Sequence, residues 1–184
     1  MVALLNLGYF GVEIAAALAI GSVALLADSI DFLEDAAVNL LILLAIGWSA
    51  LARARVGMVL AGILLIPGLA TLWTAWEKVW APVAPDPVIL GLAGGGALLV
   101  NLLCALMLAR HRSTSGTLAR AAFLSARNDA IANVAIIAAG LVTAFVWVSG
   151  WPDLIVGLAI AALNADAAHE VWEAARADER AARA

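Results

Sequence analysis

The sequence predicts an all-α polytopic membrane protein with six transmembrane helices and both termini in the cytoplasm. The first observation is composition: 65% of the 184 residues are apolar and only 13% are charged, whereas soluble domains contain about 25% charged residues. With a mean hydropathy of +1.04, the chain has too much apolar surface to bury in water, which excludes a soluble enzyme. The second observation is length, because at about 20 apolar residues per crossing the chain has room for about six helices.

Apolar runs separated by charged residues, glycines or prolines mark these helices in order. The first begins almost at the N-terminus and ends near Gly21. The fifth is longer than a bilayer requires, so we expect its polar first turns to protrude into the cytoplasm. The sixth follows Trp151-Pro152-Asp153, where a proline in the first turn loses no hydrogen bond. The predicted ranges are 2–23, 27–49, 56–76, 88–109, 118–148 and from 153 to about 172, giving a six-helix transmembrane domain over 1–172 and a short charged cytoplasmic tail over 173–184.

The basic residues predict the orientation of the chain in the membrane. Cytoplasmic loops are enriched in Lys and Arg, and Lys78 is the one basic residue on the side opposite the arginines. This places both termini in the cytoplasm and, with the brevity of the chain, suits a bacterial inner membrane. The sequence has no basic patch large enough to bind a nucleic acid. We expect Cys104, the one cysteine of the chain, to be a buried, inert thiol. The arginines follow the second and fourth helices and fill the tail: Arg53, Arg55, Arg110, Arg112, Arg120, Arg176, Arg180 and Arg183.

Carboxylates inside the second apolar run are the strongest indication of function, because ionisable groups at membrane depth are costly and therefore functional by default. Asp31 and Asp35 are four residues apart and share one helix face, which Asn39 extends by another turn. Two carboxylates so close repel each other unless they share a proton or a cation. A divalent cation would resolve this repulsion, and its binding would displace protons.

The fifth helix carries a second polar stripe at the same spacing, formed by Ser125, Asp129 and Asn133. Two such helices could enclose an ion where they cross. The alternative is that Asn133 and Ser125, like Asn39, are hydrogen-bonding residues that hold neighbouring helices together. That alternative explains three membrane carboxylates poorly, so the aspartates are the core of the predicted site.

Three further polar residues are expected to have other roles. Asp28 stands at the predicted start of the second helix, where a carboxylate caps free N–H groups. Asn6 and Glu13 are seven residues apart on the first helix and share a face that looks into the bundle. We expect each to be a packing contact, with a proton site as the alternative.

The stretch over residues 21–35 reads Gly-Ser-Val-Ala-Leu-Leu-Ala-Asp-Ser-Ile-Asp-Phe-Leu-Glu-Asp. It resembles the Gly-Ser-x-Ala-Leu-x-Ala-Asp motif of the cation diffusion facilitators, which is followed by two metal ligands four residues apart. Asp31 and Asp35 fall on those two ligand positions. Asn101 and the Trp-Pro-Asp sequence followed by Leu-Ile-Val-Gly-Leu also look like this family.

The resemblance implies proton-coupled export of a divalent metal, with zinc as the leading substrate and cadmium, manganese, iron or cobalt as alternatives. The metal is cargo here, and no cofactor is expected. In the fifth helix the family offers His or Asp four residues before an Asp, whereas this chain offers Ser125 and Asp129. Serine is a poor ligand for a transition metal, so Asn133, Asn128 or water would complete the shell, and Asn133 is preferred because it lies one turn beyond Asp129. An all-oxygen site tolerates Mn²⁺ or Mg²⁺ better than one with a histidine.

Family members commonly carry a cytoplasmic C-terminal domain, and from its length we expect this chain to be a short form without one. A homodimer would then be held by transmembrane helices in the lipid bilayer. Two other functions stay open: a transport-inactive membrane interaction protein with the same fold, and a proton or monovalent-cation pathway. An intramembrane enzyme is not expected, because no serine–histidine or cysteine–histidine pair is placed at membrane depth.

Overall fold

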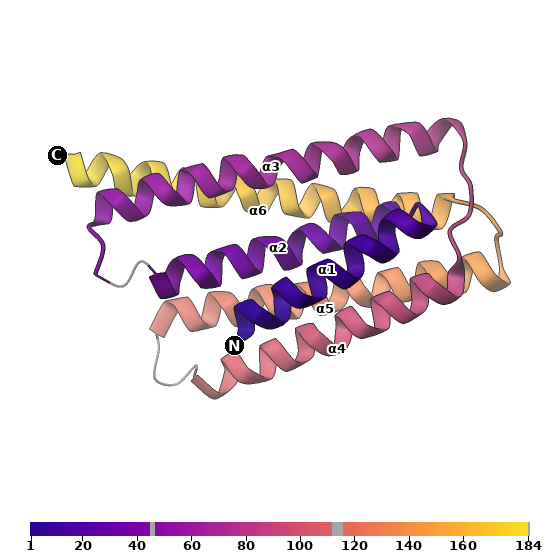
Figure 1. Ribbon diagram of the computed structural model, residues 1–184, viewed down its shortest axis with the longest axis horizontal. Helices are drawn as coiled ribbons and strands as arrows, with labels where there is room; N and C mark the ends of the chain where they lie inside the picture. The colour runs from indigo at the N-terminus through magenta and orange to yellow at the C-terminus, as the bar shows by residue number, and fades with distance from the viewer. Residues whose placement is uncertain (45–46, 112–115, 184) are drawn as a thin grey trace.

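The computed structural model describes residues 1–44, 47–111 and 116–183, and it is a bundle of long helices (Figure 1). The described residues contain no strand. Successive helices run in alternating directions, so that α1 begins and α6 ends towards the same end of the bundle. The helices are α1 (Val2–Ile20), α2 (Val23–Leu44), α3 (Ala50–Trp80), α4 (Pro87–His111), α5 (Gly116–Phe145) and α6 (Trp151–Arg183).

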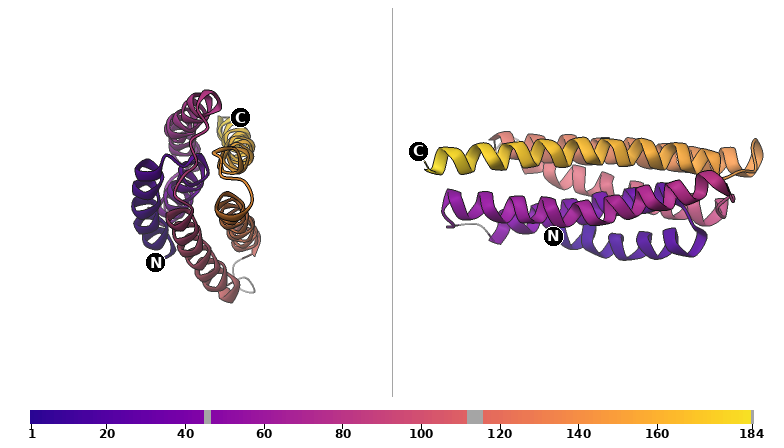
Figure 2. Two further views of the ribbon diagram at one scale, coloured as in Figure 1. Left: turned by 90° about the vertical axis from the view of Figure 1, so that its right-hand side faces the viewer. Right: turned by 90° about the horizontal axis from the view of Figure 1, so that it is seen from above.

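Helix α2 lies at the centre of this arrangement, because it contacts each of the other five helices. Around it, α3 pairs with α6 and α4 pairs with α5, while α1 packs against α2 and α4. The end-on view in Figure 2 shows the pairs on different sides of α2. A polar side chain on α2 therefore has neighbours from several helices, and this is the helix that carries the densest group of acids.

Polar residues face the inside of the bundle, and many large apolar residues face out. Asn6, Glu13, Asn101 and Asn133 are buried. Large apolar side chains exposed on the outside include those of Leu4, Leu92, Leu99, Ile131, Leu141 and Leu163. This is the reverse of a protein folded in water, and it is the pattern expected when lipid is the solvent.

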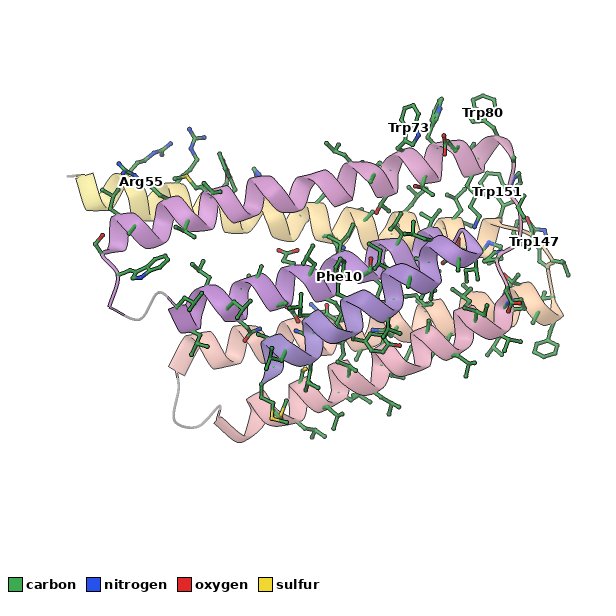
Figure 3. All side chains as sticks on the ribbon, in the orientation of Figure 1. Phe10, Arg55, Trp73, Trp80, Trp147 and Trp151 are labelled. Atoms are coloured by element: carbon green, nitrogen blue, oxygen red, sulfur yellow. The ribbon has the colours of Figure 1, made fainter. Side chains whose placement is uncertain are left out.

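Within the described residues, three helical stretches are both long and apolar enough to cross a membrane: Val2–Ile20, Pro87–Met107 and Asn128–Phe145. Helix α2 differs from them because it contains four acids, Asp28, Asp31, Glu34 and Asp35. The positions of the tryptophans support a membrane protein, because Trp side chains are enriched where the lipid bilayer meets water. Figure 3 shows Trp73, Trp80, Trp147 and Trp151 together at one end of the bundle and Arg55 towards the other.

The ends of several helices differ from the predicted ranges. Helix α3 extends beyond 56–76 at both ends, and at its start the Ser49 hydroxyl accepts a hydrogen bond from the Ala52 N–H at 3.2 Å. Helix α6 continues to Arg183, past the predicted end near residue 172. Counting apolar residues finds the part of a helix that fits a bilayer, whereas caps and packing decide where the helix ends.

The predicted start of α2 was wrong by four residues, and with it the predicted capping role of Asp28. Gly21, with a φ of 64°, ends α1 in the left-handed conformation, so that α2 begins at Val23. The cap comes instead from two residues: the Ser22 hydroxyl accepts from the Leu25 N–H at 3.1 Å, and the carboxylate of Asp153, at the start of α6, accepts from the Val23 N–H at 2.9 Å and the Ala24 N–H at 3.3 Å. Asp28 lies inside α2, where the backbone N–H groups of the helix already donate to carbonyls one turn earlier. It therefore has no free N–H groups to cap.

A buried ion pair completes this corner of the fold. The Lys78 ammonium group, from the last turn of α3, donates to Asp153 at 2.8 Å and to the Gly21 carbonyl at 2.7 Å. The Ser22 hydroxyl also donates to Asp153. Gly157 lets α6 approach closely, because a Cβ there would lie 2.7 Å from the Ala24 nitrogen. Four helices, α1, α2, α3 and α6, are thus joined at one end.

Candidate metal centre

The acidic face of α2 lies in the middle of the bundle. Asp31 and Asp35 are both partly buried and stand one helical turn apart, as their spacing predicted. The carboxylate of Asp31 interacts electrostatically with those of Asp28, Glu34 and Asp35. Like charges this close destabilise one another unless a proton or a cation lies between them.

Helix α5 brings Asp129 to this acidic face. The two helices contact each other, and Asp129 interacts electrostatically with Asp31 and Asp35. The three aspartates that the spacing singled out therefore lie within electrostatic range of one another. Ser125 also lies on α5, but its side chain is outside the described part of the structure.

The asparagines of the two stripes bond within their own helices. The Asn133 side-chain N–H donates to the Asp129 carbonyl at 2.8 Å, and the Asn39 side-chain N–H donates to the Asp35 carbonyl at 2.8 Å. Neither bond crosses to another helix, so these contacts do not hold helices together. Asn133 is fully buried and its side-chain oxygen has no hydrogen-bond partner among the described residues. That oxygen is available to a cation beside Asp129.

Helices α1 and α4 supply a further contact to the site. The Asn6 side-chain N–H donates to the Asp35 carboxylate at 3.2 Å. The Cys104 thiol in turn donates to the Asn6 side-chain oxygen at 3.4 Å, so the buried cysteine has a polar partner. The sequence placed Asn6 on an inward face but did not identify Asp35 as its partner, because the two are 29 residues apart and on different helices.

The acids share one region without being closed around a single point. Among the described residues, no group of three or more His, Cys, Asp or Glu side chains is arranged to hold a metal ion. A metal site made from Asp31, Asp35 and Asp129 therefore requires their carboxylates to converge. Partly buried carboxylates on two contacting helices can do this through rotamer changes or a small helix shift.

Residues 1–177 match a family model described as the cation efflux transmembrane domain. The chain belongs to the cation efflux family. The match covers all six helices apart from the last residues of α6, and it confirms the resemblance to the cation diffusion facilitators. A comparison with curated proteins found no match. The cation efflux domain is a membrane-spanning domain of cation transporters. The family is a transporter family and not a class of enzymes.

Proposed function

We propose that this cation efflux domain exports a divalent transition-metal ion, zinc first among the candidates, in exchange for protons. The observation that carries the proposal is the meeting of Asp31 and Asp35 on α2 with Asp129 on α5 in the interior of a cation efflux bundle. Several carboxylates close together at membrane depth favour a positive charge among them, and the cargo of the family would supply one.

The proposed ligands are Asp31, Asp35 and Asp129, with Asn133 or Ser125 completing the shell. The unpartnered oxygen of Asn133 supports its inclusion. All of these groups offer oxygen, and such a set suits Mn²⁺ as well as Zn²⁺. Cadmium, iron and cobalt remain candidates for the same reason.

Proton coupling follows from the chemistry of the ligands. Carboxylates bind a metal only when deprotonated, so metal binding and proton binding compete at the same oxygens. In an alternating-access cycle, protons arriving from outside would displace the metal outwards. Deprotonation towards the cytoplasm would then restore the affinity for the next ion.

The proposed topology has six crossings and both termini in the cytoplasm, in a bacterial inner membrane, with a homodimer held by transmembrane helices. The alternating directions of the helices support it, since α1 begins and α6 ends towards the same end. The arrangement of Arg55 and the tryptophans towards opposite ends supports it as well. In this orientation, the corner joined by Lys78 and Asp153 lies on the outer side.

The test is uptake of Zn²⁺, Cd²⁺ and Mn²⁺ into liposomes that contain the purified protein, with and without an imposed pH gradient. We expect saturable, gradient-driven uptake that is lost in Asp35→Ala. Glu173→Ala is the matched control, because its side chain is 70% exposed on α6. Normal transport by Asp35→Ala would refute the ligand assignment.

Two other outcomes would point to the remaining functions. Folded protein without uptake or saturable metal binding would favour a membrane interaction protein. Currents that do not respond to divalent metal would favour a proton or monovalent-cation pathway.

A further inference from the structure

A second pair of acids, Glu13 on α1 and Asp28 on α2, lies next to the proposed ligands, and Asp28 interacts electrostatically with Asp31 and Asp129. Both residues are 0% exposed, and their carboxyl groups lie beside each other at the α1–α2 interface. Apart from a proton that the two carboxyl groups could share, no donor among the described residues reaches any of their four oxygens. Two helices therefore place four unsatisfied oxygens together in the interior.

Asp153 shows how this chain satisfies a buried carboxylate where the role is structural. Its oxygens accept from two backbone N–H groups, the Ser22 hydroxyl and the Lys78 ammonium group. Glu13 and Asp28 have none of these, and no salt bridge of the described residues involves either acid. Buried charges are paired or bind a metal, so this pair needs either a proton that the two carboxyl groups share or a cation between them.

Tyr9 is the third oxygen-bearing side chain in this region. It interacts electrostatically with both Glu13 and Asp28. Its hydroxyl proton is donated to the Ala93 carbonyl, so the hydroxyl has only lone pairs to offer the acids. Tyr9 therefore offers the two carboxyl groups a further oxygen acceptor and no hydrogen-bond donor. A cluster of acceptors of this kind favours a cation.

The position of the pair places it on the path between the proposed centre and the outer corner. Asp28 lies three residues before Asp31 on α2, which is about 4.5 Å along the helix axis. This step leads towards Ser22, where α2 begins. The two acidic groups are therefore adjacent but separate, and they draw on different partner helices, α1 for one and α5 for the other.

We propose that Glu13 and Asp28 form a second divalent-cation site, which receives the ion from the Asp31, Asp35 and Asp129 centre on its way out. The inference rests on the proposed function for the identity of the ion, but the pair itself stands on its own geometry. Its ligands are oxygens only, so it takes hard divalent ions such as Mn²⁺ in preference to thiolate-seeking metals.

The experiment counts bound Mn²⁺ per chain by equilibrium dialysis of the full-length protein in lipid nanodiscs. We expect two ions per chain for the wild type. Glu13→Gln and Asp28→Asn keep the shape of the side chains and remove one charge each, and each is expected to bind one ion. The control Glu173→Gln is expected to bind two.

The proposed centre is tested separately in the same assay. Asp35→Ala is expected to bind one ion, and the combination with Glu13→Gln none. Binding by Glu13→Gln and Asp28→Asn equal to that of the wild type would overturn the second site. Wild-type stoichiometry in Asp35→Ala, with one ion lost in Glu13→Gln, would overturn the proposed ligands and leave the second site standing. Should a Gln or Asn variant misfold by gel filtration, Glu13→Asp replaces it, and this variant is expected to keep two ions at lower affinity.

Discussion

Removal of the Asp153 carboxylate should destabilise the bundle far more than the loss of an ordinary helix cap. In Asp153→Ala the Lys78 ammonium group, whose side chain is 7% exposed, loses its partner at 2.8 Å. The Val23 and Ala24 N–H groups lose their acceptor as well. Breaking a buried ion pair by deleting one partner costs about 3–5 kcal/mol, and a lost cap adds about 1 kcal/mol. We therefore expect a loss of about 4–6 kcal/mol in the free energy of unfolding.

Asp86 provides the matched control for this experiment. Its carboxylate caps α4 by accepting from the Val88 N–H at 2.9 Å and the Ile89 N–H at 3.0 Å. It is exposed and, unlike Asp153, forms no buried ion pair with a lysine in the described structure. Asp86→Ala should therefore cost only about 1 kcal/mol.

The assay is reversible unfolding in mixed micelles, followed by far-ultraviolet circular dichroism. The double variant Lys78→Met with Asp153→Leu removes both charges and should recover part of the loss, because an apolar pair often replaces a buried ion pair without penalty. Equal destabilisation by Asp153→Ala and Asp86→Ala would refute the reasoning, since it would mean that the ion pair adds nothing to the cap.

Three further predictions follow from close contacts and from the acids. Gly157→Ala places a methyl group 2.7 Å from the Ala24 nitrogen, so we expect a loss of about 1–3 kcal/mol in the same unfolding assay; an unchanged unfolding curve would contradict the close approach of α6 and α2. Asn6→Ala removes the donor to Asp35, and by the usual effect of a lost outer-shell partner should weaken Mn²⁺ binding about 10–100-fold in calorimetry, whereas unchanged affinity would mean that Asn6 only packs. Because metal and protons compete for the carboxylates, Mn²⁺ affinity should be higher at pH 8 than at pH 6, and a flat pH profile would argue against binding through these acids.

The number and order of the helices could be predicted from the sequence because apolar runs report directly on lipid contact. The ends of the helices could not be predicted as well. The start of α2 shows why: Ser22 is a local N-cap that the sequence interpretation passed over, and the second cap, Asp153, lies 130 residues from Val23 in the sequence. A start placed four residues too late then made Asp28 look like a cap.

The shared helix face of Asp31 and Asp35 could be predicted from spacing alone, and Asp129 on α5 lies within electrostatic range of both; that these acids bind a metal stays a prediction. Their partners could not be predicted. The contact from Asn6 to Asp35 depends on how α1 crosses α2, and the hydrogen bond from Cys104 to Asn6 joins residues 98 apart. Crossing geometry of this kind is set by packing over the whole bundle, and helical periodicity does not report it.

Helix α2 combines two kinds of buried charge, and the difference between them separates structure from transport. At its start, the Asp153 carboxylate meets a full set of donors, and such a site has no need of an added ion. Further along, no donor among the described residues reaches Asp28 other than a proton shared with Glu13, and Asp31 adds a further charge to the same face. This contrast between Asp153 and the pair of Glu13 and Asp28 is the reason for proposing that the pair binds a cation. Under the proposed function, the corner joined by Asp153 would hold one part of α2 in place while the acids further along change their charge as an ion binds and leaves.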